Sequence, residues 1–260
     1  MRILFVGDVH GKPGRRIVAE RLPALRRAYG VDAVIANGEN AAGGAGLTAG
    51  VAAELFAAGV DAITGGNHIW QNREAYDLLD SDPRVLRPAN YPPGVPGRGA
   101  AVITAAGGAT MGVLNLQGRV FMMSIDDPFR VGREQAALLR KSAPVVVVDF
   151  HAEATSEKVA MGWYLDGAVS AVIGTHTHVQ TADERILPGG TAYISDAGMT
   201  GPRDGIIGMA REAILERFLT QLPARFEVAP GPVQLNAVVL SVDADGRATA
   251  IERVQLFSEA

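Results

Sequence analysis

The chain of 260 residues contains no cysteine. This absence excludes disulfide bonds, thiolate-ligated zinc and cysteine nucleophiles in one step. Aromatic residues make up only 6% of the chain, charged residues 20%, and the net charge is −4. The basic excess that marks a general nucleic-acid binder is therefore missing, so we expect no stable nucleic-acid binding. A small phosphorylated substrate stays compatible with this charge.

Long hydrophobic runs are also missing. No segment approaches the roughly 20 apolar residues that span a bilayer, and the apolar stretch at the N-terminus is too short for a signal peptide. We therefore expect a cytoplasmic protein without membrane association. No linker, repeat or low-complexity tract interrupts the chain, so residues 1–260 are predicted to form a single domain.

Apolar runs instead alternate with helix-like segments, which predicts an α/β fold. Buried strands are predicted at 2–6, 33–36, 60–64, 111–116, 145–150 and 169–173, and helices at 14–29, 48–58, 72–79, 132–141 and 156–165. The strands do not alternate apolar with polar residues, so both of their faces should be covered. Segments 236–242 and 249–257 flank Asp243-Ala244-Asp245-Gly246 and predict a hairpin, whereas the proline-rich segment 88–99 predicts a rigid connection.

The chain does contain five histidines, and all of them fall in short motifs that suit metal binding. They are His10 in Gly-Asp-Val-His-Gly, His68 in Gly-Gly-Asn-His, His151 after a valine-rich run, and His176 and His178 in Gly-Thr-His-Thr-His. Imidazole and carboxylate together suit divalent transition metals, so a metal centre is the leading hypothesis.

Ligand-type side chains recur at one structural position. Asp8, Glu39, Asn67, His151 and His176 each follow directly on a predicted buried strand. In open α/β sheets, ligands bind outside the carboxyl ends of the strands, so these side chains are expected to converge on one edge.

Each residue has an ordinary interpretation when it is taken alone. Asp8 could cap a helix, Asn40 could belong to a polar loop, Asn67 could be a left-handed turn residue, and a single histidine is often a surface residue. All of these interpretations would have to hold at several strand ends at once. No Gly-x-Ser-x-Gly elbow offers a serine hydrolase instead.

The ordered motifs resemble those of the calcineurin-like metallophosphoesterases. They are Gly-Asp8-x-His10, Gly-Glu39-Asn40, Gly-Asn67-His68, His151 and Gly-x-His176-x-His178. That resemblance implies a four-layer α/β/β/α sandwich with a dinuclear metal site at the carboxyl ends of the strands.

Two differences from the usual superfamily motifs are typical of one branch of the superfamily. Gly-Glu39-Asn40 stands in place of the usual Gly-Asp, and Gly-Asn67-His68 is not followed by the usual acid. Segments 195–202 and 205–208 are similar to that branch as well. The chain thus resembles the YmdB-like bacterial cyclic-nucleotide phosphodiesterases over nearly its whole length.

The resemblance implies two metal ions, iron or manganese, that share one bridging carboxylate. The implied ligands are Glu39 as the bridge, Asp8, Asn40 and His178 at the first ion, and Asn67, His151 and His176 at the second. His68 would be the general acid rather than a ligand. His10 is a further candidate, either as a ligand of the ordinary superfamily kind or as a neighbour of the site.

The implied function is hydrolysis of a cyclic nucleotide, with 2′,3′-cyclic AMP as the leading candidate, by a hydroxide that the two ions activate. His68 would protonate the departing ribose oxygen. One alternative is a phosphomonoesterase or nucleotidase of the same superfamily. Another is a metal-dependent regulatory protein that binds a nucleotide with little turnover. A single structural metal is disfavoured by the surplus of ligands, and a homo-oligomer stays open.

Overall fold

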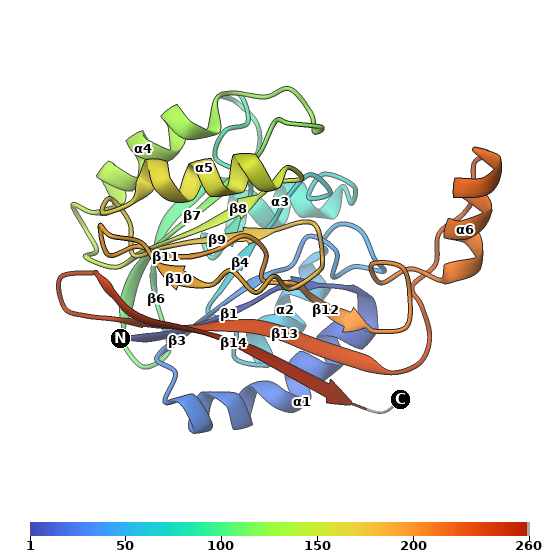
Figure 1. Cartoon of the computed structure of the whole chain (residues 1–260), viewed down its shortest axis with the longest axis horizontal. Helices are drawn as coiled ribbons and strands as arrows, with labels where there is room; N and C mark the ends of the chain where they lie inside the picture. Colours follow the sequence, from blue (N-terminus) through green and yellow to red (C-terminus); the bar gives the residue numbers. More distant parts are fainter. Residues whose placement is uncertain (259–260) are drawn as a thin grey trace.

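The valine- and isoleucine-rich runs form two β-sheets that pack face to face in the computed structural model, which describes residues 1–258 (Figure 1). The first sheet has the order β2 (Asp8–Val9), β12 (Met199–Pro202), β13 (Val233–Val242), β1 (Arg2–Val6), β3 (Ala33–Asn37), β4 (Ala62–Thr64) and β5 (Val85–Leu86), with β14 (Ala248–Ser258) paired to β13. The second sheet has the order β10 (Arg185–Ile186), β11 (Ala192–Ile194), β9 (Ala171–Thr175), β8 (Val146–His151), β7 (Thr110–Gln117) and β6 (Ala100–Thr104).

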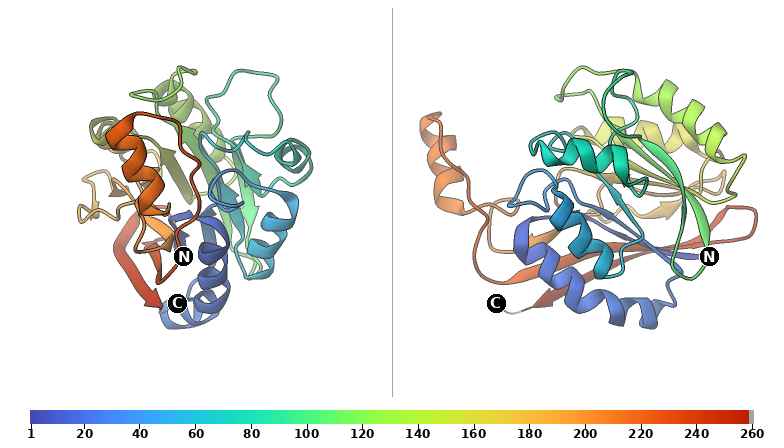
Figure 2. Two further views of the ribbon diagram at one scale, coloured as in Figure 1. Left: turned by 90° about the vertical axis from the view of Figure 1, so that its right-hand side faces the viewer. Right: turned by 180° about the vertical axis from the view of Figure 1, so that it is seen from behind.

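Helices cover the outer face of each sheet. The first sheet is covered by α1 (Gly11–Tyr29), α2 (Ala49–Ala57) and α3 (Glu74–Ser81), and the second by α4 (Pro128–Leu139) and α5 (Thr155–Leu165). The predicted four-layer α/β/β/α architecture is confirmed, and Figure 2 shows the layers from two further sides.

Three separate cores fill the spaces between the four layers. Along β1, Leu4 packs with the helices while its neighbour Phe5 packs between the sheets. Along β8, Val147 faces the first sheet while Val148 faces α4 and α5. Successive side chains point to opposite faces of a strand, and both faces here are covered. This explains why the strands read as continuous apolar runs.

The predicted elements form, with shifted ends. The first helix begins at Gly11 rather than at residue 14. Pro13 does not prevent this earlier start, because it lies in the first turn, where its missing N–H removes no hydrogen bond of the helix. The fourth helix likewise begins at Pro128, four residues before the predicted start, with the Asp127 side chain as its cap. The hairpin β13–β14 and the irregular segment 88–99 are as predicted.

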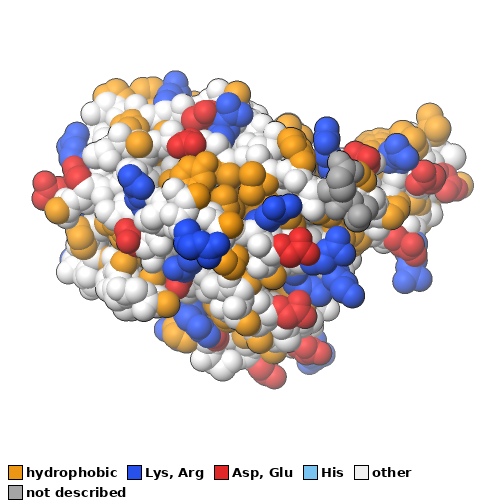
Figure 3. Space-filling view, turned by 90° about the horizontal axis from the view of Figure 1, so that it is seen from below, with side chains coloured by type: hydrophobic (Ala, Val, Ile, Leu, Met, Phe, Trp, Pro, Cys, Tyr) orange, Lys and Arg blue, Asp and Glu red, His pale blue; other side chains and the backbone are white. Residues whose placement is uncertain are grey.

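Several short elements were not predicted. Strands such as β11 and β12 are only three or four residues long, and β12 contains both a glycine and a proline. The helix α6 (Arg211–Thr220) stands away from the body, with Phe218 and Leu219 exposed (Figures 1 and 2). Figure 3 shows this arm from below, beside a face on which acidic and basic side chains are interspersed.

Parallel pairing aligns the strand ends that matter for function. Strands β1, β3 and β4 run parallel in one sheet, and β7, β8 and β9 run parallel in the other. The loops that follow them therefore emerge along one edge of the sandwich. Within residues 1–258, no helix is long and apolar enough to cross a bilayer.

Candidate metal centre

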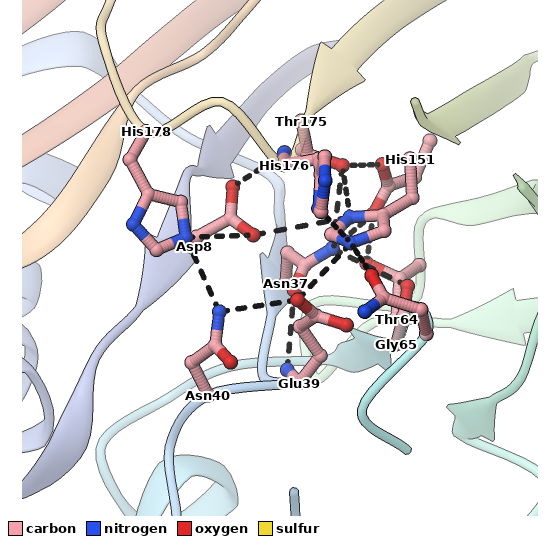
Figure 4. A network of polar contacts seen from close by, with 12 residues as sticks. Asp8, Asn37, Glu39, Asn40, Thr64, Gly65, His151, Thr175, His176 and His178 are labelled. Carbon is pink, nitrogen blue, oxygen red and sulfur yellow. Dashed lines mark hydrogen bonds and ion pairs between the residues drawn. The ribbon is translucent and has the colours of Figure 1, made fainter. Parts of the chain in front are cut away.

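Strand ends and the loops that follow them bring the sequence-predicted side chains to that edge. Figure 4 shows six of these side chains close together, namely Asp8, Glu39, Asn40, His151, His176 and His178. Asp8 and Glu39 are fully buried, as is His151, and Asn40 is 2% exposed. The remaining residues of the set reach the same cluster or its border. They are His10, Asn67, His68, His176 and His178.

Three side chains converge on one nitrogen of His151. His151 Nε2 lies 3.0 Å from Glu39 Oε1, 3.1 Å from Asn67 Oδ1 and 3.1 Å from His176 Nδ1. The ligand atoms of Glu39, His151 and His176 all lie within 4.8 Å of one another. This is the spacing of donor atoms around a single cation.

A second group lies beside the first and shares Glu39 with it. His178 Nε2 is 3.9 Å from Asp8 Oδ1 and 3.2 Å from the side-chain nitrogen of Asn40. The same Asn40 nitrogen is 3.1 Å from Glu39 Oε1. Glu39 therefore stands between the two groups, where a carboxylate can bridge two ions.

The other nitrogen of His151, which lies 3.9 Å from Asp8 Oδ1, is held by a relay. His151 Nδ1 donates to Thr175 Oγ1 at 2.9 Å, and that hydroxyl donates to Asp149 Oδ1 at 2.7 Å. Asn37 Nδ2 donates to the other Asp149 oxygen at 2.9 Å. Burial raises the pKa of Asp149 to about 6, although nearby His151 lowers it. The relay orients the ring so that Nε2 faces the cluster.

The other two histidines are oriented in the same way. His178 Nδ1 donates to the carbonyl oxygen of Ile207 at 2.9 Å, which leaves Nε2 for the cluster. His176 Nε2 lies 3.1 Å from Glu153 Oε2, which leaves Nδ1 for the cluster. Metal-ligating histidines almost always give their second nitrogen to such an oxygen acceptor. Three independent acceptors around three clustered histidines thus fit a metal centre.

The electrostatics of the cluster favour a cation. Burial alone would raise the pKa of Glu39, but His151 holds it well below its usual range. Burial alone would lower the pKa of His151, but the Glu39 carboxylate raises it to about 9. Burial together with the charge of His151 lowers the pKa of His176 to about 3. Glu39 is therefore ionised and His176 is neutral, as a metal ligand must be, whereas His151 carries a proton that it would have to release on binding a metal.

Two buried residues of the cluster carry side-chain atoms without hydrogen-bond partners, although Asp8 Oδ2 accepts from the backbone N–H of His176 at 3.2 Å. Among the described residues, Asp8 Oδ1 and both ring nitrogens of His10 are buried without a partner. Burial, with a smaller contribution from His178, lowers the pKa of His10 to about 3, so its ring is neutral. A buried polar atom without a partner costs about 1–3 kcal/mol. A bound cation would supply the missing partner for such atoms, so the donor set fits metal ions.

The backbone of the cluster is specialised. A Cβ at Gly66 would overlap Glu39 Oε2 and His151 Nε2, so only glycine fits there. His176 and His178 have φ angles of 96° and 68°, a left-handed conformation that costs non-glycine residues about 1–3 kcal/mol each. Such strain persists only where the surrounding structure enforces it.

His68 lies at the border of the cluster. Its side chain is 34% exposed, and its Nδ1 is 2.9 Å from Asn40 Oδ1. Its backbone N–H donates to Glu39 Oε2 at 3.1 Å. A histidine fixed next to the ligands but open to solvent suits proton transfer to a bound substrate.

Sequence reasoning missed the residues that orient the histidines. For Asp149 a signal was available, since alternation along a strand places it on the same face as His151. Thr175 directly precedes the His-x-His motif and could have been noted for that reason. No pattern indicates the carbonyl of Ile207, because it comes from a loop far away in sequence.

Comparison with known proteins identifies the family of the chain. The family model described as YmdB-like protein matches residues 4–254. The chain belongs to the YmdB-like family. It is 54% identical over 255 residues to a 2′,3′-cyclic-nucleotide 2′-phosphodiesterase of Bacillus subtilis (strain 168), covering 98% of this chain and 96% of that protein. The crystal structure of a hypothetical protein from Thermus thermophilus has a TM-score of 0.92 at 47% identity and matches 99% of both chains.

A more distant structure shows how widely the fold of this YmdB-like chain is shared. A 5′-nucleotidase precursor, also from Thermus thermophilus, superimposes with a TM-score of 0.60 at 15% identity, over 100% of this chain but 54% of that one. This likeness concerns the fold alone. The family predicted from Gly-Glu39-Asn40 and Gly-Asn67-His68 is confirmed.

Proposed function

We propose that this YmdB-like chain is a metal-dependent phosphodiesterase that hydrolyses cyclic nucleotides, with 2′,3′-cyclic AMP as the leading substrate. The observation that carries the proposal is the arrangement of His151, His176 and His178. Each ring has one nitrogen held by an oxygen acceptor and the other turned to the ionised Glu39 or its neighbours. The name of the Bacillus subtilis relative supports the choice of substrate class.

Two metal ions fit the donor set, with Glu39 between them. Asp8, Asn40 and His178 would hold one ion, with His10 as a further candidate beside them. Asn67, His151 and His176 would hold the other. Nitrogen and oxygen donors without thiolate suit iron or manganese.

To bind a metal ion, the side-chain amide of Asn40 must change its orientation. Its Oδ1 now accepts from His68 Nδ1, and its Nδ2 faces Glu39 and His178. Binding a cation through Oδ1 requires the amide group to rotate by half a turn. His68 Nδ1 would then lose that acceptor and keep Glu39 Oε1, at 3.5 Å, as its neighbour.

The chemistry divides between the bound ions and the protein. When bound, a pair of ions lowers the pKa of a shared water, so that hydroxide is available at neutral pH. The remaining requirement is a proton for the departing ribose oxygen. His68 is the residue placed to deliver it, because it is partly exposed and both its backbone N–H and its Nδ1 face the Glu39 carboxylate. A positioned general acid contributes about 10²–10⁴-fold in rate.

The test is hydrolysis by protein reconstituted with manganese or iron, with and without chelator. The substrates to compare are 2′,3′-cyclic AMP, 3′,5′-cyclic AMP and 5′-AMP. We expect chelator-sensitive opening of 2′,3′-cyclic AMP. Hydrolysis of 5′-AMP alone would identify a nucleotidase instead, and metal binding without any turnover would identify a nucleotide-binding regulatory protein.

We also propose that the chain forms a single domain. The three cores run continuously between the layers, which supports a single domain over residues 1–260. We also propose a cytoplasmic enzyme that acts on a small phosphate ester. Metal analysis of the purified protein distinguishes iron from manganese, and its mass in solution decides whether it is a homo-oligomer.

A further inference from the structure

A buried ion pair lies directly behind the loop that carries His176 and His178. Lys158 of α5 and Asp196 of the loop before β12 have side chains that are only 2% and 1% exposed. Lys158 Nζ donates to Asp196 Oδ2 at 2.8 Å. Neither side chain reaches the cluster of donor atoms, and neither has a role in the chemistry proposed above.

The Asp196 carboxylate binds Thr177, the residue between the two histidines. Its Oδ2 accepts from the backbone N–H of Thr177 at 3.0 Å and from the Thr177 hydroxyl at 2.6 Å. Its Oδ1 accepts from the backbone N–H of Gly198 at 2.8 Å. Every group facing this carboxylate is a donor. An asparagine would turn an NH₂ group toward at least one of them.

The backbone that follows Asp196 holds both sides of the same loop. The N–H of Ala197 donates to the carbonyl of Gly174 at 2.8 Å, and the N–H of Met199 donates to the carbonyl of His178 at 3.0 Å. The loop between these two anchors contains the left-handed backbone of His176 and His178. Asp196 thus binds Thr177 in the middle of the loop, and backbone hydrogen bonds hold the two ends of that loop at Gly174 and His178.

We propose that Asp196 is a positioning residue for the metal centre, with Lys158 as its buried ion-pair partner, which also donates to the Thr177 hydroxyl at 3.2 Å. By binding Thr177, the carboxylate holds His176 and His178 in the left-handed backbone that turns one ring to each group of donor atoms. This inference rests on the metal centre of the proposed function. It adds two residues that act through the ligand loop rather than on the substrate.

The other interpretation is that the pair only stabilises the fold. Asp61 provides a matched carboxylate for that comparison, because it pairs with Arg26 and accepts from the backbone N–H groups of Val34 and Ala106. It directly precedes β4 and so lies at the amino ends of the strands, away from the cluster. Its bonds touch no predicted ligand.

The experiment measures Mn²⁺ binding to chelator-treated protein by titration calorimetry, together with the melting temperature without metal. The variants are Asp196→Asn, Thr177→Val and the control Asp61→Asn. We expect Asp196→Asn to weaken binding about 10–100-fold, as losses of groups that orient metal ligands do. Thr177→Val, which removes one hydroxyl and keeps the shape, should weaken it less. Asp61→Asn should lower the melting temperature and leave Mn²⁺ affinity unchanged.

Equal Mn²⁺ affinity of Asp196→Asn and the wild type would overturn the inference, whatever happens to the melting temperature. If Asp196→Asn does not fold, Thr177→Val decides in its place, and wild-type affinity there would overturn the inference too. A wild-type protein that binds no metal at all would instead refute the proposed function. The two failures are therefore distinguishable.

Discussion

Carboxylates buried at the two ends of the parallel strands differ in their hydrogen-bond partners. At the amino ends, Asp61 is buried, and both of its oxygens are used, by Arg26 and by two backbone N–H groups. At the carboxyl ends, Asp8 is buried with Oδ1 unpartnered, and so are both nitrogens of His10. Leaving such atoms without partners destabilises a fold. Arg26 Nε beside Asp61 also lacks a partner, so an unpartnered atom alone does not mark the functional end. What distinguishes the carboxyl end is that its unpartnered atoms, a carboxylate oxygen and two imidazole nitrogens, lie together and are of the kind that binds a cation.

The same difference extends to the histidines. The carboxyl edge carries His151, His176 and His178 with one nitrogen each committed to an oxygen acceptor and the other turned inward. The inward nitrogens face each other at distances such as 3.1 Å between His151 and His176. Such crowding is stable with a shared proton or a shared cation between them.

Replacing Glu39 by Gln removes the charge that joins the two groups of ligands, and it should have the largest effect. We expect turnover to fall by about 10³-fold or more, toward the level of chelator-treated protein, because several kcal/mol of electrostatic stabilisation are lost. The measurement is chelator-sensitive hydrolysis of 2′,3′-cyclic AMP together with metal content. A near-normal rate with full metal content would refute the bridging role.

The matched change at the other end is Asp61→Asn, which provides the control. It should cost roughly 1–3 kcal/mol of unfolding free energy, since a buried acceptor for Arg26 and two amides is weakened. Its hydrolysis rate and metal content should match the wild type. Loss of metal from this variant would mean that the two ends are not independent.

Replacing His68 by Ala should separate chemistry from metal binding at the carboxyl edge. We expect a loss of about 10²–10⁴-fold in kcat with metal content retained, because a general acid is lost and no ligand is removed. Substrates with good leaving groups should be affected less than 2′,3′-cyclic AMP, since they need no proton. Loss of metal from His68→Ala would show that its ring is a ligand after all.

The sequence predicted which residues lie at the carboxyl ends of the strands, but it did not predict the contacts between them. Continuous apolar strands indicate a covered sheet, and a covered parallel sheet places Asp8, Glu39 and His151 at one edge whatever the exact strand ends. Short elements such as β12 were missed because a strand of four residues with glycine and proline has no apolar period.

The orientation of the side chains in the site could not be predicted from the sequence. The carbonyl of Ile207 and the carboxylate of Asp196 reach the histidine loop through tertiary packing, and no local pattern encodes that approach. The distance between Glu39 and His151 likewise depends on the packing of one sheet against the other. Motif order predicted which residues gather, and packing decides which atoms face each other.

Replacing Gly66 by Ala tests how tightly the ligands are packed. The added Cβ would overlap Glu39 Oε2 and His151 Nε2, so one ligand must move. We expect metal affinity to fall about 10–100-fold, as for other changes that misplace ligands. The control is Gly50→Ala in α2, where a Cβ meets nothing within 4 Å. It should bind metal normally and be slightly more stable, and equal metal affinity of the two variants would show that the ligands tolerate displacement.

Among the changes at the cluster, replacing His10 by Ala should have the smallest effect, and it addresses the residue whose role the motifs left open. The ring is 1% exposed, has no hydrogen-bond partner and lies 5.7 Å from the His178 ring, centroid to centroid. If His10 supplements Asp8, Asn40 and His178 at one ion, its loss should weaken only one of two Mn²⁺ equivalents, by about tenfold at the lower end of the range for metal-site changes. Titration calorimetry resolves the two equivalents. A variant with both affinities unchanged and a higher melting temperature would show instead that His10 is only an unsatisfied neighbour, because removing a buried unpaired imidazole relieves its desolvation cost.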